Sequence, residues 1–385
     1  MLLLLIFIYQ RNSMKRVRVG LVGAGAVASS VHLPILTRRS DLYEVVAIAD
    51  LNLAATHVLA DRFGISRENC FDSPEKLITS GSVDAIMVLN SGSHSEVVVS
   101  ALGAGLNVFC EKPLAYTKRE MVEIEKALKS SGKQLMIGYM KTFDNAVIAA
   151  RNAIKSRPKT VDVLVLHPSG DSQLVTSELS VDMPASPAAL NGIFSKIKSE
   201  TQQEALGEAA AKSFGDLYTD IVLGSVIHEF SVLRALNVHI TEVDFVDRWP
   251  SPGQSEAIII HARTADGVRV TIRWFYLDQY PAYQEEIRWV NEEEGHHLIF
   301  PSPYILRIPT QLISTRRRGI DHEVTRTNSY SASFENELVA FHNLVLTGKQ
   351  EYDPIADGYE DLAIAQMIAK KIAEREGTQR GGDIA

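Results

Sequence analysis

Cysteine is scarce in this sequence, which has only Cys70 and Cys110 among 385 residues. Two cysteines exclude a disulfide-rich scaffold, and they leave no second pair from which to build a cysteine metal cluster. Their scarcity suits a reducing compartment. We therefore expect a cytoplasmic protein with no disulfide and no metal site.

An excess of positive charge and a long hydrophobic run are also missing. The formal net charge of -8 argues against a nucleic-acid partner. The apolar stretch "MLLLLIFIY" has nine residues, whereas a membrane span needs about 20, and no basic segment precedes it as in a secretory signal. We expect residues 1–13 to be an appendage or an upstream start before Met14, with weak contact to a membrane surface as the open alternative.

The length and the composition indicate a globular protein of two domains. A chain of 385 residues exceeds the size at which one core usually stops growing, and 45% hydrophobic and 22% charged residues are ordinary values. Short apolar segments alternate with helical patterns from residue 17 onward, as in a parallel sheet built from βαβ units. The predicted strands are 17–23, 43–50, 83–90, 107–111 and 134–139. We expect a doubly wound Rossmann domain over 14–138.

The pattern changes in the second half, where strands follow one another directly. Candidate strands are 160–167, 243–249, 256–262, 268–276 and 285–295, and Asp266-Gly267 forms a hairpin turn between two of them. They predict an α+β domain over 139–385 with an antiparallel or mixed sheet. A polar segment at 168–219 is expected to carry helices, and a last helix at 358–376 is expected to pack on either domain.

The first predicted strand leads into a glycine-rich turn, "VGLVGAGAVASSVHLP". Gly23 and Gly25 allow a tight turn and a close approach of the backbone to a pyrophosphate at the start of a helix, with Ala28 in the third position of the pattern. Asp50 ends the second strand, where a carboxylate can bind ribose hydroxyls. The alternative for Asp50 is a helix cap.

The stretch "NVFCEKPLAY" places charges directly after a strand. Glu111, Lys112 and Pro113 follow the apolar residues 107–110. They either mark the exit of a strand into solvent or stand at the carboxyl end of a parallel strand, where open α/β sheets bind ligands.

These segments, together with "LNSGSHSE" (89–96) and "GYMKTFDNA" (138–146), resemble the glucose-fructose oxidoreductase and inositol dehydrogenase family, Gfo/Idh/MocA. The motifs that carry the resemblance lie between about residues 15 and 155, and the likeness is looser beyond. The resemblance implies an NAD(P)-binding Rossmann domain and a second domain with an open-faced, mostly antiparallel sheet, which holds the substrate and forms oligomer contacts. A homodimer or homotetramer is the expected assembly.

The resemblance also implies roles for individual residues. Lys112 corresponds to the active-site lysine of the family, and it is expected to contact both cofactor and substrate. The other cofactor-binding residues that we expect are Gly23, Gly25, Ala26, Val27, Asp50, Leu51, Asn90, His94 and Glu111. Three alternatives stay open: Glu111 as a solvated strand end, Asn90 as a turn cap and His94 as a surface residue.

The second domain supplies the remaining candidates. His228, in "LGSVIHEFSVLRAL", matches the second catalytic residue of the family, and it is expected to act with Lys112 on the reacting oxygen of the substrate. The family's aspartate four residues earlier is Gly224 here, and a later acidic position is Ser231. Lys141 is a candidate substrate ligand or a solvated lysine, and the alternative for His228 is a core histidine.

We therefore expect a nicotinamide-dependent oxidoreductase that acts on a secondary alcohol or ketone of a sugar, a cyclitol or a sugar derivative. The expected cofactor is NAD rather than NADP, because the carboxylate of Asp50 would repel a 2′-phosphate. Two other possibilities stay open: a dinucleotide-binding sensor without turnover, and an enzyme that uses NAD transiently in sugar elimination or hydrolysis. The expected partner is a small polyol or sugar, with no nucleic acid and no membrane.

Overall fold

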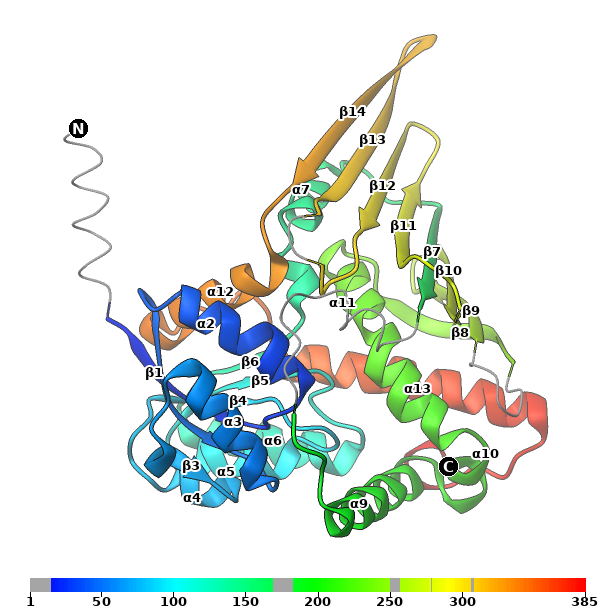
Figure 1. The fold of residues 1–385 in the computed structure, drawn as a ribbon. Helices are drawn as coiled ribbons and strands as arrows, with labels where there is room; N and C mark the ends of the chain where they lie inside the picture. Colours follow the sequence, from blue (N-terminus) through cyan, green and yellow to red (C-terminus); the bar gives the residue numbers. More distant parts are fainter. Residues whose placement is uncertain (1–14, 169–182, 250–256, 278, 306–307) are drawn as a thin grey trace, which may run out of the picture. The chain divides into compact units, whose positions relative to one another are not determined.

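The computed structural model describes residues 15–168, 183–249, 257–277, 279–305 and 308–385. The chain forms two compact units (Figure 1). The first unit holds the chain up to Gly138 together with Leu179–Lys198 and Glu337–Gly358, and the second holds Tyr139–Glu178, Ser199–Asn336 and Tyr359–Ala385. The chain first passes from one unit to the other after Gly138, and two later segments return to the first unit. The expected appendage 1–13 lies outside the described residues.

The first unit is built on a parallel sheet with the strand order β3-β2-β1-β4-β5-β6. Its described strands are β1 (Val17–Val22), β2 (Tyr43–Ala49), β3 (Cys70–Phe71), β4 (Ala85–Val88), β5 (Asn107–Cys110) and β6 (Leu135–Ile137). All four residues of β4 are buried, as in a strand that is covered on both faces. The expected doubly wound fold is confirmed, with the short β3 as an addition.

Helices follow these strands as the βαβ pattern predicts. They are η1 (Ala28–His32), α2 (Leu33–Arg38), α3 (Leu53–Phe63), η2 (Arg67–Asn69), α4 (Pro74–Ile78), α5 (Ser95–Gly103) and α6 (Lys118–Ser131). Three further helices contribute residues to both units, namely α9 (Ala188–Leu206), α12 (Ser333–Thr347) and α13 (Pro354–Glu376). Helix α12 packs on the first sheet: Phe341 meets Phe109 of β5 edge to face at 5.5 Å, and the Tyr43 hydroxyl donates to the carbonyl of Leu338.

The second unit contains a mixed sheet with the order β14-β13-β12-β11-β7-β10-β9-β8. Its described strands are β7 (Thr160–His167), β8 (Ile240–Arg248), β9 (Ala257–Thr264), β10 (Arg269–Tyr276), β11 (Gln284–Val290), β12 (Glu294–Phe300), β13 (Thr310–Arg318) and β14 (Asp321–Ser329). Only the pair β7 and β10 is parallel among them. Buried and more exposed residues alternate along β10 and β12, as expected for a sheet with one covered face.

The remaining helices of the second unit are η3 (Met140–Phe143), α7 (Asn145–Ala153), α10 (Glu208–Asp216), the π-helix η4 (Leu217–Val226), α11 (Ile227–Ala235) and η5 (Gly382–Ile384). The helices expected within 168–219 are present from residue 188 onward, while 169–182 lie outside the described residues. None of the described helices is long and apolar enough to span a bilayer.

One prediction for the second sheet is wrong. Residues 285–295 do not form one strand, because a turn at Asn291 separates β11 from β12. The Asn291 side-chain oxygen accepts hydrogen bonds from the backbone N–H groups of Glu293 and Glu294, and such a local contact offers the chain an alternative to the strand. The hairpin of β13 and β14 (Figure 1) was not predicted, because the side chains of β14 are almost wholly exposed and mostly polar.

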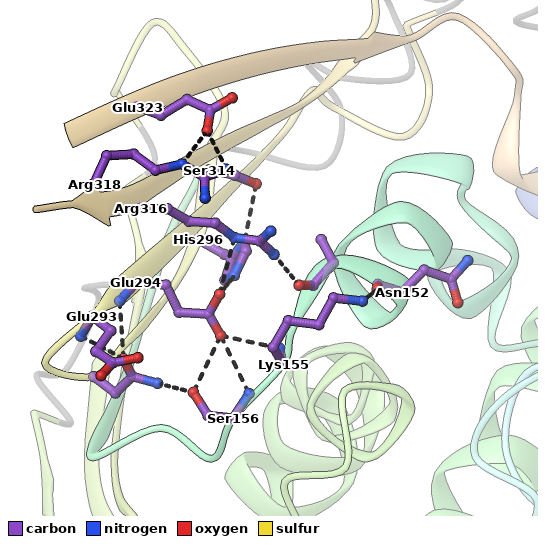
Figure 2. A network of polar contacts seen from close by, with 12 residues as sticks. Asn152, Lys155, Ser156, Glu293, Glu294, His296, Ser314, Arg316, Arg318 and Glu323 are labelled. Atoms are coloured by element: carbon purple, nitrogen blue, oxygen red, sulfur yellow. Dashed lines mark hydrogen bonds and ion pairs between the residues drawn. The ribbon is translucent and has the colours of Figure 1, made fainter.

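Glu294, the first residue of β12, joins three parts of the second unit (Figure 2). Its carboxylate accepts hydrogen bonds from the backbone N–H groups of Lys155 and Ser156 at 3.0 and 3.3 Å, just after α7, and from Arg316 Nε of β13 at 3.1 Å. Arg316 also donates to the carbonyl of Ala153, the last residue of α7. The end of α7 is thereby fixed to the sheet through one buried carboxylate.

Candidate cofactor and catalytic sites

The glycine-rich turn lies between β1 and the helix that starts at residue 26. Gly23 has φ +107°, and a Cβ there would lie 2.5 Å from the backbone nitrogen of Asn90 at the end of β4. Only glycine fits this position. At Gly25, a Cβ would meet no described atom within 4 Å. The turn is therefore tight at its first glycine and open at its second, as the expected approach of a phosphate requires.

Asp50 connects this turn to the next helix. Its Oδ2 accepts a hydrogen bond from the N–H of Ala24 at 2.7 Å, and its Oδ1 accepts one from the N–H of Asn52 at 2.7 Å. The alternative role as a helix cap is met in part, since Asn52 is the residue that precedes α3. Each carboxylate oxygen keeps further acceptor capacity. Leu51, beside it, is exposed.

His94 joins the exits of β4 and β5. Its Nδ1 lies 2.7 Å from the carbonyl of Pro113, and its Nε2 lies 2.8 Å from the carbonyl of Asn90. Carbonyl oxygens only accept hydrogen bonds, so both contacts are hydrogen bonds when the ring carries two protons. The side chain is buried, which rules out the alternative of a surface histidine. His94 therefore holds backbone in place, and both of its nitrogens are engaged in doing so.

Asn90 offers one polar atom toward a ligand. Its amide nitrogen donates to the carbonyls of Ser91 and Ser93, so the expected capping alternative is present. Its Oδ1 is buried and has no hydrogen-bond partner among the residues that the structure describes. A buried acceptor of this kind is costly unless something donates to it.

Glu111 is fixed immediately before Lys112. Its Oε1 accepts a hydrogen bond from His32 Nε2 at 2.8 Å, and its backbone N–H continues the strand ladder to Val88. Burial opposes the charge of Glu111, yet the bond from His32 and the nearby positive charges lower its pKa overall. The alternative of a solvated strand end is wrong, since this side chain is only 13% exposed. Lys112 thus lies between two residues that are each held by a histidine.

Glu337 of α12 completes a cluster that was not anticipated. One ligand atom each of Glu337, Glu111 and His32 lie within 4.8 Å of one another, although no metal site was expected. Glu337 is fully buried, and neither of its oxygens has a hydrogen-bond partner within the described ranges. Burial and the charge of Glu111 raise its pKa well above the usual value. No local pattern could reveal it, because Glu337 follows Glu111 by more than 200 residues in the sequence.

His228 is the second residue of α11, directly after the π-helix η4. It is half-buried, and its carbonyl accepts a hydrogen bond from Ser231 Oγ at 2.7 Å. π-Helical turns are frequent at functional sites. At Gly224, within η4, a Cβ would lie 3.1 Å from the carbonyl oxygen of Thr219. An acidic side chain at this position would therefore be crowded by the wide turn itself.

Lys141 lies in a buried charge cluster beside α11. Its Nζ is 2.6 Å from Glu285 Oε2 and 3.3 Å from Glu229 Oε1, and Tyr283 also donates to Glu285. Burial opposes the charge of Lys141, but the two carboxylates raise its pKa overall. The alternative of a solvated lysine is therefore wrong. Its ammonium is engaged with two carboxylates, which the sequence did not indicate.

Glu229 is the unusual acid of this cluster. Burial and the neighbouring charge of Glu285 raise its pKa to about 8, against the lowering effect of Lys141. With Glu229 protonated, one ammonium faces one carboxylate, and the buried cluster is electrically neutral. Its Oε2 has no hydrogen-bond partner in the described part of the chain.

Comparison with known proteins agrees with this geometry. Residues 17–139 match the model of an oxidoreductase family with an NAD-binding Rossmann fold. Inositol 2-dehydrogenase of Burkholderia ambifaria is 25% identical over 360 residues, which cover 92% of this chain and 93% of the relative. The enzyme of the same name from Agrobacterium fabrum is 32% identical over 165 residues, or 42% of this chain and 48% of the relative.

Solved structures show the same fold along nearly the whole chain. Myo-inositol 2-dehydrogenase of Lactobacillus plantarum has a TM-score of 0.67 at 19% identity, covering 94% of this chain and 98% of that one. UDP-N-acetylglucosamine 3-dehydrogenase of Acidithiobacillus ferrooxidans also has a TM-score of 0.67, at 16% identity, covering 93% of this chain and 98% of that one. The chain therefore has the same two-domain fold as these dehydrogenases. Its residues 17–139 belong to the Gfo/Idh/MocA oxidoreductase family, as the motifs around Gly23 and Lys112 suggested.

Proposed function

We propose that this protein transfers a hydride between NAD(H) and a secondary alcohol or ketone of a cyclitol or sugar. The observation that carries the proposal is the placement of Lys112 at the exit of β5, between two residues that histidines hold in place. The inositol 2-dehydrogenases that align with more than 90% of this chain support a polyol as the substrate class.

The first unit fits a dinucleotide at the carboxyl edge of its sheet. Gly25 leaves space beside the backbone, Asp50 presents carboxylate oxygens, and Asn90 presents a buried acceptor without a partner among the described residues. When bound, the nicotinamide supplies the hydride acceptor or donor. We propose that Gly23, Ala26 and Val27 bind the pyrophosphate through their backbone, and that Leu51 flanks the adenosine.

Residues of the chain itself must transfer a proton and stabilise a developing negative charge. Alcohol oxidation leaves a proton to be removed, and ketone reduction builds charge on the carbonyl oxygen. We propose that the ammonium of Lys112 stabilises this oxygen and that His228 is the proton donor or acceptor. Lys141, whose ammonium is held by Glu229 and Glu285, is proposed to shape the substrate-binding surface of the second unit.

The preference for NAD over NADP is part of the proposal. Asp50 would repel a 2′-phosphate, and its neighbours Leu51 and Asn52 carry no compensating positive charge. A 3-ketoreductase of Actinomadura kijaniata with a similar fold was solved with NADP, so both cofactors occur on this architecture. Titration of the protein with NADH and NADPH tests the preference, and equal or tighter binding of NADPH would overturn it.

A screen of inositols and sugars for cofactor reduction tests the proposed reaction. With a confirmed substrate, Lys112→Ala and His228→Ala are each expected to lower turnover by a factor on the order of 100, while NADH binding is largely kept. The exposed Lys126→Ala is the matched control, and it should behave as the wild type. If neither catalytic variant changes turnover, the catalytic assignment is wrong.

Two other functions predict different outcomes of this screen. Binding without turnover favours a dinucleotide-binding sensor, and formation of product without net NADH favours a transient use of NAD. The cytoplasmic location and the homodimeric or homotetrameric assembly stay predictions.

A further inference from the structure

We propose that Glu337 is a neutral carboxylic acid and that, with His32, it positions Glu111 and thereby Lys112. The inference rests on the proposed function only in its last step, which is the link from Glu111 to catalysis. The protonation of Glu337 and its contact with the cluster are properties of the first unit, and they can be measured without a substrate.

The three side chains come from distant parts of the sequence and converge behind the exit of β5. His32 stands in the π-helical turn η1, Glu111 directly follows β5, and Glu337 stands in α12. His32 and Glu337 are completely buried, and the carboxylate of Glu111 is largely covered. A buried carboxyl group with no hydrogen bond from any described residue is the least suitable place in this unit for a negative charge.

A proton on Glu337 removes one of the two negative charges that the cluster would otherwise hold. His32 donates to Glu111 at 2.8 Å, so this pair consists of an imidazole and an accepting carboxylate. A second carboxylate within 4.8 Å would add an uncompensated negative charge in a buried place. A protonated Glu337 instead has a donor to offer, and a carboxylate oxygen of Glu111 that can accept lies within 4.8 Å of it. The raised pKa of Glu337 agrees with this arrangement.

A divalent cation is the other species that could balance two carboxylates and an imidazole. His32 Nε2 already meets Glu111 Oε1 in a direct hydrogen bond at 2.8 Å, so two of the three groups are paired without an ion between them. The contact therefore favours the proton over a cation. The two possibilities differ in what they require of Glu337: a proton makes it neutral, and a cation makes it anionic.

Other titratable groups around the cluster are few. Glu337 is faced by Glu111 and His32, and its charge also acts on Tyr43, whose hydroxyl contacts the backbone of α12. The charges of Lys112 and His94 lower the pKa of Glu111, and burial together with the charge of Glu111 raises the pKa of Cys110. His342, five residues further along α12, bonds to the carbonyl of Lys15.

The connection to Lys112 is short. Glu111 precedes Lys112 in the chain, so the direction in which Glu111 is held sets the direction from which the Lys112 side chain departs. Loss of the neutral acid would release one side of Glu111 while His32 kept the other. We therefore expect Glu337 to act through position, with its effect on turnover and not on the affinity for NADH.

The test compares Glu337→Gln with Glu337→Ala in the full chain. Glutamine reproduces a neutral acid in size and polarity, so Glu337→Gln should keep turnover near that of the wild type, while Glu337→Ala should lower it roughly 10- to 100-fold through misplacement of Lys112. The unfolding temperatures of both variants and of the wild type are measured from pH 5 to pH 9. The infrared spectrum of the wild type at pH 7, minus that of Glu337→Gln, should contain the carbonyl band of a protonated carboxylic acid.

The change in stability with pH has a definite expected direction. An acid whose pKa is raised by folding stabilises the folded protein at low pH, and this stabilisation is lost as the pH rises from the unfolded value of about 4.3 toward the raised one. The unfolding temperature of Glu337→Gln should therefore equal that of the wild type near pH 5 and exceed it increasingly at higher pH. A variant less stable than the wild type at neutral pH, or a missing infrared band, overturns the neutral acid. A stoichiometric divalent metal in the wild type that is lost in Glu337→Gln also overturns it. Normal turnover of Glu337→Ala with the band present overturns only the positioning role.

Discussion

Replacement of Lys141 by methionine should destabilise the second unit strongly. At an effective dielectric constant of about 20, an ammonium 2.6 Å from the carboxylate of Glu285 interacts with this charge by roughly 6 kcal/mol. Much of this attraction offsets the desolvation of the buried ions. Removal of one partner from a buried ion pair costs about 3–5 kcal/mol, because the remaining charge stays unpaired.

Thermal unfolding at pH 7 measures this cost. With about 2–4 °C per kcal/mol for a unit of this size, Lys141→Met should lower the unfolding temperature by roughly 6–20 °C. Lys129→Met, which breaks only an exposed pair with Glu125 on α6, is the matched control and should change little. A shift of Lys141→Met no larger than that of the control would refute the claim that this ammonium holds the cluster together.

Further predictions concern single carboxylates and one histidine. Glu229→Gln should remove a pH dependence of the free energy of unfolding. The wild type loses stability as the pH rises from about 4.3 to the Glu229 pKa of about 8. Chemical denaturation should therefore show the variant becoming more stable relative to the wild type across this interval. Asp50→Ser should weaken NADH binding and reduce the preference for NADH over NADPH, as measured by fluorescence titration with each cofactor. His94→Gln should lower turnover more than the affinity for NADH in paired kinetic and binding assays, because it disturbs the contacts to the carbonyls of Asn90 and Pro113. Glu294→Gln should lower the free energy of unfolding by about 1–3 kcal/mol in a urea titration, since it weakens the bonds at the end of α7.

The first sheet was predictable from the sequence because its signals are local. Buried parallel strands such as β4 appear in the sequence as continuous apolar runs. Gly23 marks the turn after β1, because the positive φ at this position favours glycine. The edge strand of the second sheet was not predictable, because its sequence lacks such a local signal. β14 carries mostly exposed polar side chains, so its pairing with β13 depends on backbone hydrogen bonds that no pattern of hydrophobic residues announces.

The candidate site divides in the same way. Lys112 and Asp50 stand at strand ends, where position along the chain already indicates position on the sheet. The sequence does not indicate which residues contact the side chains of the site. His32 faces Glu111 across 79 residues of sequence, and Lys141 meets Glu285 across 144. Such contacts exist only after the chain has folded, and a lysine that looks solvated in the sequence is then found inside a charge cluster.

The return of α12 to the first unit determines when that unit can be finished during synthesis. Phe341, Leu338 and Glu337 emerge from the ribosome some 200 residues after the last strand of the parallel sheet, β6. Until then, Phe109 and Tyr43 lack the helix that covers them, and Glu111 lacks one of its neighbours. The nascent Rossmann sheet is therefore an incomplete folding unit through most of translation, and release of the nearly full-length chain is what closes it.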